Sequence, residues 1–585
     1  GRAATEGSLL DIGRRVRTCR GSAPGMGSPR KRILYWGPDY ACFEGLVRSI
    51  AGSRPTPVVE EGLELSHPRA EITFCPSFNA RTVLARLDER FVHLLVLDLR
   101  CPNGAALDDR IAAARELVRA LDDVDDMEAR YGFHRILVLV GGADEERIDR
   151  LLVELGGYGI RHVHKDRGGD AAFGPAVLER ALSLMLDREP ARTALCAAGG
   201  GITGIFFELG AFKCLEDCLG DGAIHDFDMY FGISAGAVVT SVIANGFSAD
   251  EMMAALAGAE GGRIPPLDFS LLKLGHLNLP DYARRAGELV GKALSSLSDL
   301  AAGRGRPTLD GAFLELTAAA GAPFRSDRYE EMLRAILESP GATNRFDELP
   351  KELYIGASNQ DSRQHVLFGP GGETPISRAV QASLSINPAF SGVEIDGVWY
   401  EDGAVTRTSN FTEAIHRGAG LVLVVDPFVP YVSQRPGFAN RRGMLFNIDQ
   451  DVRCLSYTRF ENARQWALRR HPEVSSYTFL PNNRLRRELS VNPMDHRPFL
   501  SIFKGAYLGT LRRILQIEHR LRGDLAVQGI ELRTERAQAI AERLEATTTP
   551  RLEDFFVDGR LDIRTPPLAR SRRAVARGAT TAVRA

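Results

Sequence analysis

The chain has 585 residues, of which 44% are hydrophobic and 25% charged, and its 73 basic side chains nearly balance 75 acidic ones for a net charge of -2. This composition is typical of a globular protein and excludes wholesale disorder. It also provides no global positive field, so we expect no nucleic-acid partner. At roughly 150 residues per domain, the length allows about four domains.

The basic ends of the chain are predicted to be disordered. Residues 1–32 form a leader with eight Lys or Arg and two acidic residues, without the apolar segment of a secretory signal. Residues 546–585 form a basic, low-complexity tail. Both ends could add weak attraction to anionic lipid, so we expect a cytoplasmic protein that contacts membranes at most peripherally.

The eight cysteines are thinly scattered, with no CxxC pair and no Cys/His cluster of zinc-like spacing. This pattern indicates reduced thiols in a cytosol. It predicts no metal site and no cofactor.

Residues 33–166 alternate apolar runs with helical patterns, which predicts a small doubly wound α/β domain. Asp98 ends the third predicted strand and Lys165 the fifth, a placement that resembles a response-regulator receiver domain. Only Asp39 follows the first strand, where receivers carry an acidic pair, and Gly141 stands where they carry Ser or Thr. Because an aspartyl phosphate needs Mg²⁺ held by several carboxylates, we do not expect phosphorylation. A degenerate receiver-like regulatory module and an unrelated α/β domain both remain open. The expected strands cover residues 33–36, 71–74, 93–99, 135–140 and 161–165.

A linker helix is expected over residues 167–193, and a second α/β region begins at residue 194. The run 229–249 is uncharged and long enough to span a bilayer. It contains three glycines, three serines and Asn245, so we interpret its start as a buried strand followed by a turn. Residues 440–545 are predicted to be helical.

The turn after this strand carries a G-x-S-x-G motif, Gly232-Ile233-Ser234-Ala235-Gly236. A strand before and a helix after it are the context of a nucleophile elbow. About 0.3 chance matches to this pattern are expected in such a chain, so the context has to decide its meaning. The helix that follows directs its positive end toward developing negative charge.

A second glycine turn, Gly199-Gly200-Gly201-Ile202-Thr203-Gly204, lies between another strand and helix. Its backbone N–H groups could form an oxyanion hole. The same residues fit the G-x-G-x-x-G pattern of a dinucleotide-binding turn, which stays a less favoured alternative because the next strand ends in Gly-Ile-Ser rather than in an acidic residue.

A third motif, Asp402-Gly403-Ala404, follows the strand-like GVWYE. Together, the three motifs resemble those of patatin-like phospholipases. The resemblance covers roughly residues 194–430 and implies a three-layer α/β/α hydrolase domain extending to about residue 545. It implies Ser234 as nucleophile, Asp402 as its base, and Gly199, Gly200 and Gly201 as the oxyanion hole.

The predicted function is therefore a phospholipase A-like lipid acyl hydrolase with a serine–aspartate dyad, acting on phospholipid or another lipid ester. Alternatives are a lipid- or partner-binding scaffold without activity, and a Ser-His-Asp esterase using one of four downstream histidines. Those histidines are His416, His471, His496 and His519. The apolar stretch 264–280 is a candidate lid.

Overall fold

The protein forms two compact units in a computed structural model. The first comprises the described residues up to Ala191 together with Gln465–Ser475 and Arg512–Gly529. The second comprises Arg192–Arg464, Ser476–Leu511 and the described residues from Ile530 onward. The structure describes residues 30–51, 58–59, 62–100, 107–123, 130–141, 145–166, 172–187, 190–220, 222–259, 262–267, 278, 283–285, 287, 322, 324–387, 389–491 and 499–557. The predicted leader up to residue 29 and most of the candidate lid (residues 268–277) lie outside these ranges.

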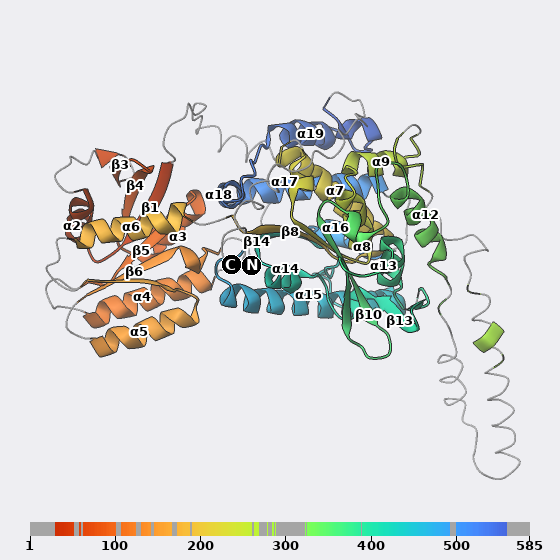
Figure 1. The fold of residues 1–585 in the computed structure, drawn as a ribbon, viewed down its shortest axis with the longest axis horizontal. Coiled ribbons are helices and arrows are strands. Elements are labelled where there is room, and N and C mark those ends of the chain that lie inside the picture. Colours follow the sequence, from red (N-terminus) through yellow and green to blue (C-terminus); the bar gives the residue numbers. More distant parts are fainter. Residues whose placement is uncertain are drawn as a thin grey trace, which may run out of the picture. The chain divides into compact units, whose positions relative to one another are not determined.

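The first unit contains a seven-stranded sheet in the order β2-β3-β4-β1-β5-β6-β7 (Figure 1). Its five parallel strands coincide with the five strands expected from the sequence, and their order, 2-1-3-4-5, is that of a doubly wound fold. They are β1 (Arg30–Trp36), β4 (Ala70–Ser77), β5 (Leu94–Asp98), β6 (Ile136–Gly141) and β7 (His162–Asp166). The antiparallel strands β2 (Val58–Val59) and β3 (Gly62–His67) extend the edge.

Helices cover both faces of this sheet. Residues of α3 (Ala80–Glu89), α4 (Leu107–Asp122) and α5 (Glu145–Gly157) form one buried core with it. Residues of α2 (Tyr40–Ala51) and α6 (Phe173–Leu186) form the other. The stretch 167–193, expected to be a linker helix, thus contains a helix that packs into this unit.

Asp98 of this unit is buried and already engaged. It accepts hydrogen bonds from the Tyr35 hydroxyl at 2.9 Å and from the Arg100 guanidinium at 2.9 and 2.7 Å. The guanidinium of Arg100 is thus bound to the carboxylate of Asp98, the residue on which the resemblance to receiver domains is based. The regulatory role of the unit stays a prediction.

The second unit is a three-layer α/β/α structure. Its sheet has the order β12-β13-β10-β9-β8-β14-β15, with β11 paired to β10. The strands are β8 (Arg192–Ala197), β9 (Met229–Ile233), β10 (Glu352–Asn359), β11 (His365–Phe368), β12 (Val393–Ile395), β13 (Val398–Asp402), β14 (Ala419–Val425) and β15 (Ser475–Phe479). The four strands β10, β9, β8 and β14 are parallel, whereas β13 is antiparallel to β10.

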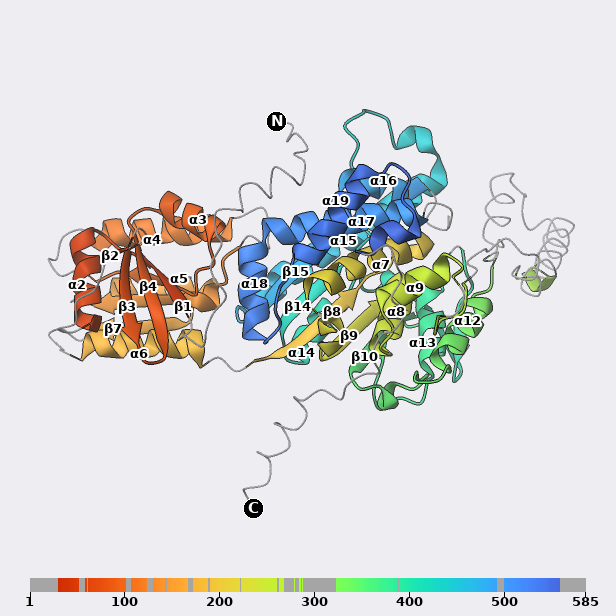
Figure 2. The same cartoon turned by 90° about the horizontal axis from the view of Figure 1, so that it is seen from above.

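Helices from distant parts of the sequence form the outer layers of this unit. In Figures 1 and 2, α7 (Gly201–Cys218) and α17 (Phe499–Gln516) lie on one side of the sheet, and α14 (Phe411–His416) and α15 (Met444–Arg470) on the other. The other described α-helices of this unit are α8 (Ala235–Ala244), α9 (Ala249–Leu256), α12 (Asp327–Leu337), α13 (Ile376–Leu384), α16 (Asn483–Val491) and α19 (Glu535–Ala546). The helix α18 (Glu518–Val527) belongs to the first unit.

The uncharged run 229–249 forms β9, a tight turn and α8, in which all ten residues are buried. Its apolar character thus reflects a position in the protein core. Among the described residues, no helix is both long and apolar enough to cross a membrane.

The predicted basic tail contains a folded part. Residues up to 557 belong to the described structure, and Phe555 and Phe556 are buried. The Phe556 ring lies 5.6 Å from Lys213 Nζ on α7, and Phe555 packs against Phe503. Two aromatic side chains therefore anchor a segment whose overall composition suggested disorder, and the rest of the tail lies outside the described residues.

Candidate active site

Ser234 lies on the sharp turn between β9 and α8. Its backbone has φ 53° and ψ -119°, one of three positive-φ conformations at non-glycine residues in the described chain. Such strain persists only where the surroundings enforce it, and it clusters at functional sites. A Cβ on Gly236 would lie 2.4 Å from the carbonyl of Ala197, so the motif needs glycine there. A Cβ on Gly232 would lie 2.3 Å from Thr240 Oγ1, so the motif needs glycine at this position too.

Ser383, on α13, holds this turn in place. Its hydroxyl accepts a hydrogen bond from the Ser234 N–H at 2.8 Å and donates one to the Gly356 carbonyl on β10 at 2.6 Å. Ser383 is not among the site residues predicted from the sequence. Nothing in a single serine on a helical pattern distinguishes it, because its role depends on a contact between residues 149 apart in the chain.

The glycine turn after β8 lies directly beside Ser234. A Cβ on Gly199 would lie 3.2 Å from Ser234 Cβ and 3.7 Å from Ala404 Cβ, so the first and third motifs both contact this turn. Gly201 begins α7 with φ 67°. Among the described residues, none accepts a hydrogen bond from the N–H of Gly199 or Gly200. These donors, with the positive end of α7 behind them, are free to bind an anionic oxygen.

Asp402 ends β13 and is 1% exposed. Its Oδ1 accepts a hydrogen bond from the Ala404 N–H at 2.8 Å, and its own N–H donates to the Ser385 carbonyl at 3.0 Å. Burial raises the pKa of the carboxyl to about 7, although hydrogen bonds from Ala404 and the Ser234 side chain oppose this rise. The charge of Glu401 raises the pKa further. A carboxyl with this pKa can accept and return a proton near neutral pH.

Two of the four histidines considered for a triad have other partners. Nε2 of His519 lies 3.2 Å from the Leu87 carbonyl, and Nδ1 of His471 lies 3.2 Å from Glu473, whereas His496 lies outside the described residues. His416 ends α14. Within the described chain, none of these makes a hydrogen bond with Ser234 or Asp402.

A fifth histidine, His365, lies near the backbone of Asp402. Its Nδ1 is 3.1 Å from Thr406 Oγ1, which contacts Ser358 Oγ at 2.8 Å, and Ser358 donates to the Asp402 carbonyl at 2.9 Å. Burial lowers the pKa of His365 to about 4, so its ring is neutral at pH 7. It supports the loop that carries Asp402 and has no contact with the carboxylate among those described.

An apolar pocket extends from Ser234 between α7, α8, α12 and the segment after α13. Its walls are almost entirely aliphatic and aromatic, and it encloses about 50 Å³. The lining residues are Gly201, Ile202, Ile205, Ser234, Val238, Val242, Met252, Leu267, Tyr329, Met332, Leu333, Ile336, Leu384, Ile386 and Phe390.

Comparisons with known proteins agree with the motifs. The family profile of patatin-like phospholipases matches residues 195–415, which include Ser234 and Asp402. None of the curated proteins searched matches the chain.

Sixteen chains of solved structures also match. One is VipD from Legionella pneumophila, with 15% identity over 61% of this chain and 76% of that chain, and a TM-score of 0.23. Another is full-length ExoU in complex with SpcU, from the type III secretion system of Pseudomonas aeruginosa, with 15% identity, 61% and 62% coverage, and a TM-score of 0.20. TM-scores this low do not establish a shared overall fold.

Proposed function

Residues 195–415 form a patatin-like phospholipase domain, and from this premise we propose that the protein hydrolyses carboxylic esters of lipids, with Ser234 as nucleophile and Asp402 as its base. The observation that carries the proposal is the position of Ser234, on a strained turn at the same level of the sheet as the buried Asp402, whose pKa burial raises to about 7. A serine hydroxyl needs such a partner because it is a weak nucleophile on its own.

The reaction follows from this pairing. Asp402 accepts the hydroxyl proton as Ser234 Oγ bonds to the ester carbon, and the carbonyl oxygen becomes an oxyanion. The N–H groups of Gly199 and Gly200 and the N-terminus of α7 at Gly201 stabilise that charge. When the C–O bond breaks, Asp402 returns the proton to the leaving alcohol. Water then repeats the sequence on the acyl-enzyme, releasing the fatty acid and restoring the hydroxyl.

The apolar pocket at Ser234 supports a fatty-acyl chain as the group transferred. It offers aliphatic walls and few hydrogen-bonding groups, which favours burial of hydrocarbon.

A membrane surface is the proposed source of the lipid. Val405 in the Asp402 loop is 38% exposed, and the exposed face of α15 carries Met444, Ile448 and Leu455, the last 67% exposed. Arg459, one turn after Leu455, donates to the Val405 carbonyl at 3.2 Å, which places this face beside the loop. Exposed arginines, Arg441, Arg442 and Arg459, complement an anionic bilayer.

Vesicle sedimentation tests this surface. Met444→Ser and Leu455→Ser together should reduce binding to vesicles that contain phosphatidylglycerol. Val153→Ser, which changes an equally exposed valine of the first unit, should not. Equal binding by all variants would contradict the proposed surface.

Fatty-acid release from mixed phospholipid vesicles, in the presence of chelator, tests the catalytic proposal. Ser234→Ala and Asp402→Asn should each lower the rate by at least about 10³-fold, because each removes a member of one proton-transfer unit. Asp396→Asn is the matched control, since Asp396 is an exposed aspartate in the turn before β13. Full activity of Asp402→Asn would assign the base elsewhere and favour a histidine. No release by the full-length protein from any lipid ester would favour the non-catalytic scaffold.

A further inference from the structure

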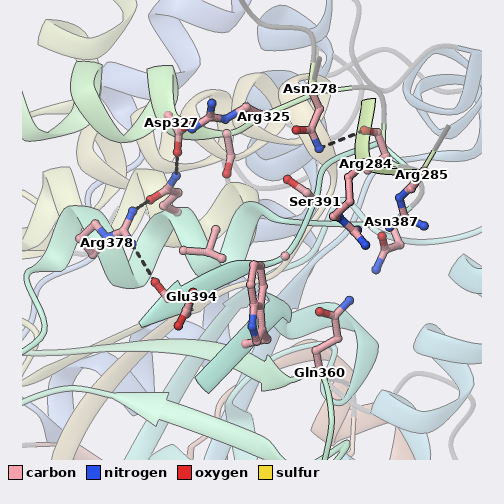
Figure 3. A pocket seen from close by; sticks show the side chains of 16 residues that line it. Asn278, Arg284, Arg285, Arg325, Asp327, Gln360, Arg378, Asn387, Ser391 and Glu394 are labelled. Carbon is pink, nitrogen blue, oxygen red and sulfur yellow. Dashed lines mark hydrogen bonds and ion pairs between the residues drawn. The ribbon is translucent and has the colours of Figure 1, made fainter. Parts of the chain in front are cut away.

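A second pocket, of about 710 Å³, is lined mainly by polar side chains (Figure 3). Arginine, amide and hydroxyl side chains dominate its lining, and Trp399, 44% exposed, adds an aromatic surface. The lining residues are Asn278, Arg284, Arg285, Ala322, Arg325, Ser326, Asp327, Gln360, Arg378, Gln381, Asn387, Ser391, Gly392, Val393, Glu394 and Trp399.

The two pockets share a wall. In the segment after α13, Ile386 and Phe390 line the apolar pocket, whereas their neighbours Asn387 and Ser391 line the polar one. Tyr329, in α12, lines the apolar pocket, whereas Ser326, just before α12, lines the polar pocket. In the pairs Ile386/Asn387 and Phe390/Ser391, the two residues are neighbours in the chain and line different pockets. Their Cα atoms are about 3.8 Å apart, so a single peptide unit separates the two linings there.

Hydrogen bonds connect the polar pocket to Asp402. Ser326 Oγ lies 3.2 Å from Ser385 Oγ, and the Ser385 carbonyl accepts from the Asp402 N–H. Asn387 donates to the carboxylate of Glu401, the residue before Asp402, at 3.0 Å. The polar pocket thus lies next to the proposed reaction centre.

Arginine is the most frequent charged residue in this pocket. Four arginines line it, together with the two carboxylates of Asp327 and Glu394. Asp327 is paired with Arg325 and accepts from Gln381 at 2.8 Å. Arg378 donates to two uncharged acceptors, the Gln381 side chain and the Glu394 backbone carbonyl, the latter at 2.9 Å. The N-terminus of α12 at Asp327 adds its positive end.

We propose that this pocket binds the phosphate of the substrate's head group while an acyl chain occupies the apolar pocket. Guanidinium groups suit phosphate because their planar donors match its oxygens. The amides of Asn278, Gln360 and Asn387 can bind head-group hydroxyls. The inference rests on the proposed function and narrows it, because it makes the preferred substrate a glycerophospholipid rather than a lipid ester without phosphate.

Substrate comparison in the full-length protein tests the inference. Arg378→Gln and Arg285→Gln should each lower kcat/KM at least about tenfold on dihexanoyl-phosphatidylglycerol and leave kcat/KM on dihexanoylglycerol within about twofold. Arg345→Gln is the control, because Arg345 is an exposed arginine that pairs with Glu348 away from both pockets. An equal fall on both substrates, or no fall on either, would overturn the head-group assignment. Equal melting temperatures confirm that the variants fold.

Direct binding separates failure of this inference from failure of the proposed reaction. Calorimetry on Ser234→Ala with dihexanoyl-phosphatidylglycerol should give an affinity at least about tenfold higher than with dihexanoylglycerol, and Arg378→Gln should remove the difference. This holds whether or not the protein turns either lipid over. Arg378-dependent binding of inorganic phosphate without any preference for the phospholipid would assign the pocket to free phosphate and refute the head-group role.

Discussion

Asp402→Asn should stabilise the fold while it abolishes hydrolysis. The pKa of Asp402 is about 7 in the folded protein, against about 3.9 in an unfolded chain. Between pH 4 and pH 7, Asp402 keeps its proton in the folded state but has lost it in the unfolded state. The free energy of unfolding therefore decreases as the pH rises through this range. Linkage converts the difference to about 4 kcal/mol, an upper limit for a fully buried carboxyl. Asparagine has no such pH-dependent cost, and its Oδ1 can still accept from Ala404.

Melting temperature at several pH values tests this reasoning. The variant should melt close to the native protein at pH 4.5 and several degrees above it at pH 8. Comparing the two proteins at each pH removes contributions from other buried acids whose pKa is also raised, such as Asp426 and Glu216. The native kcat/KM should rise with pH to half its maximum near pH 7. A constant melting difference, or half-maximal activity near pH 4, would refute a buried, proton-accepting Asp402.

Three further substitutions test the surroundings of the site. Gly236→Ala should destabilise the protein by about 1–3 kcal/mol or more in chemical denaturation, because its Cβ would overlap the Ala197 carbonyl; unchanged stability would mean that the turn is not tightly packed. Ser383→Ala leaves the buried Ser234 N–H without its acceptor, at a cost of about 1–3 kcal/mol, and should lower kcat with KM unchanged, whereas Ser383→Thr should recover part of the rate. Glu208 is fully buried, and burial and Asp426 hold its pKa well above the usual range, so Glu208→Gln should raise the melting temperature at pH 9 more than at pH 5; the reverse order would indicate that Glu208 is ionised in the fold.

Local patterns were sufficient to predict the five parallel strands of the first unit and the three motifs. β5 and β6 read as unbroken apolar runs because both faces of a parallel sheet are covered by helices. Gly232 and Gly236 mark the turn because neither position has space for a Cβ. Such features depend on neighbours within a few residues, so a single sequence reveals them.

Features that depend on long-range contacts escaped prediction. β15 is a five-residue strand between helices, identifiable mainly by its position beside β14. α6 has the composition of any amphipathic helix, and only its packing against the first sheet assigns it to that unit. In the wall between the two pockets, the apolar residues Ile386 and Phe390 are each followed by a polar residue, Asn387 and Ser391. The sequence alone does not show that these residues line two pockets, because the pockets form only when α12 packs against this segment.

Strand register explains how residues 168 positions apart meet. Gly356 of β10 is paired with Ile233 of β9, and the next residue, Ala357, is paired with Asp402 of β13. Ser234 and Asp402 therefore leave the sheet at the same level, although β13 runs opposite to β9. A Cβ on Gly403 would lie 2.4 Å from the Gly356 carbonyl, so the Asp402 loop closes over β10 only because Gly403 has no side chain. A slip of one residue in β13 would turn the carboxylate to the other face of the sheet, which makes the hairpin register as necessary to the proposed dyad as either side chain.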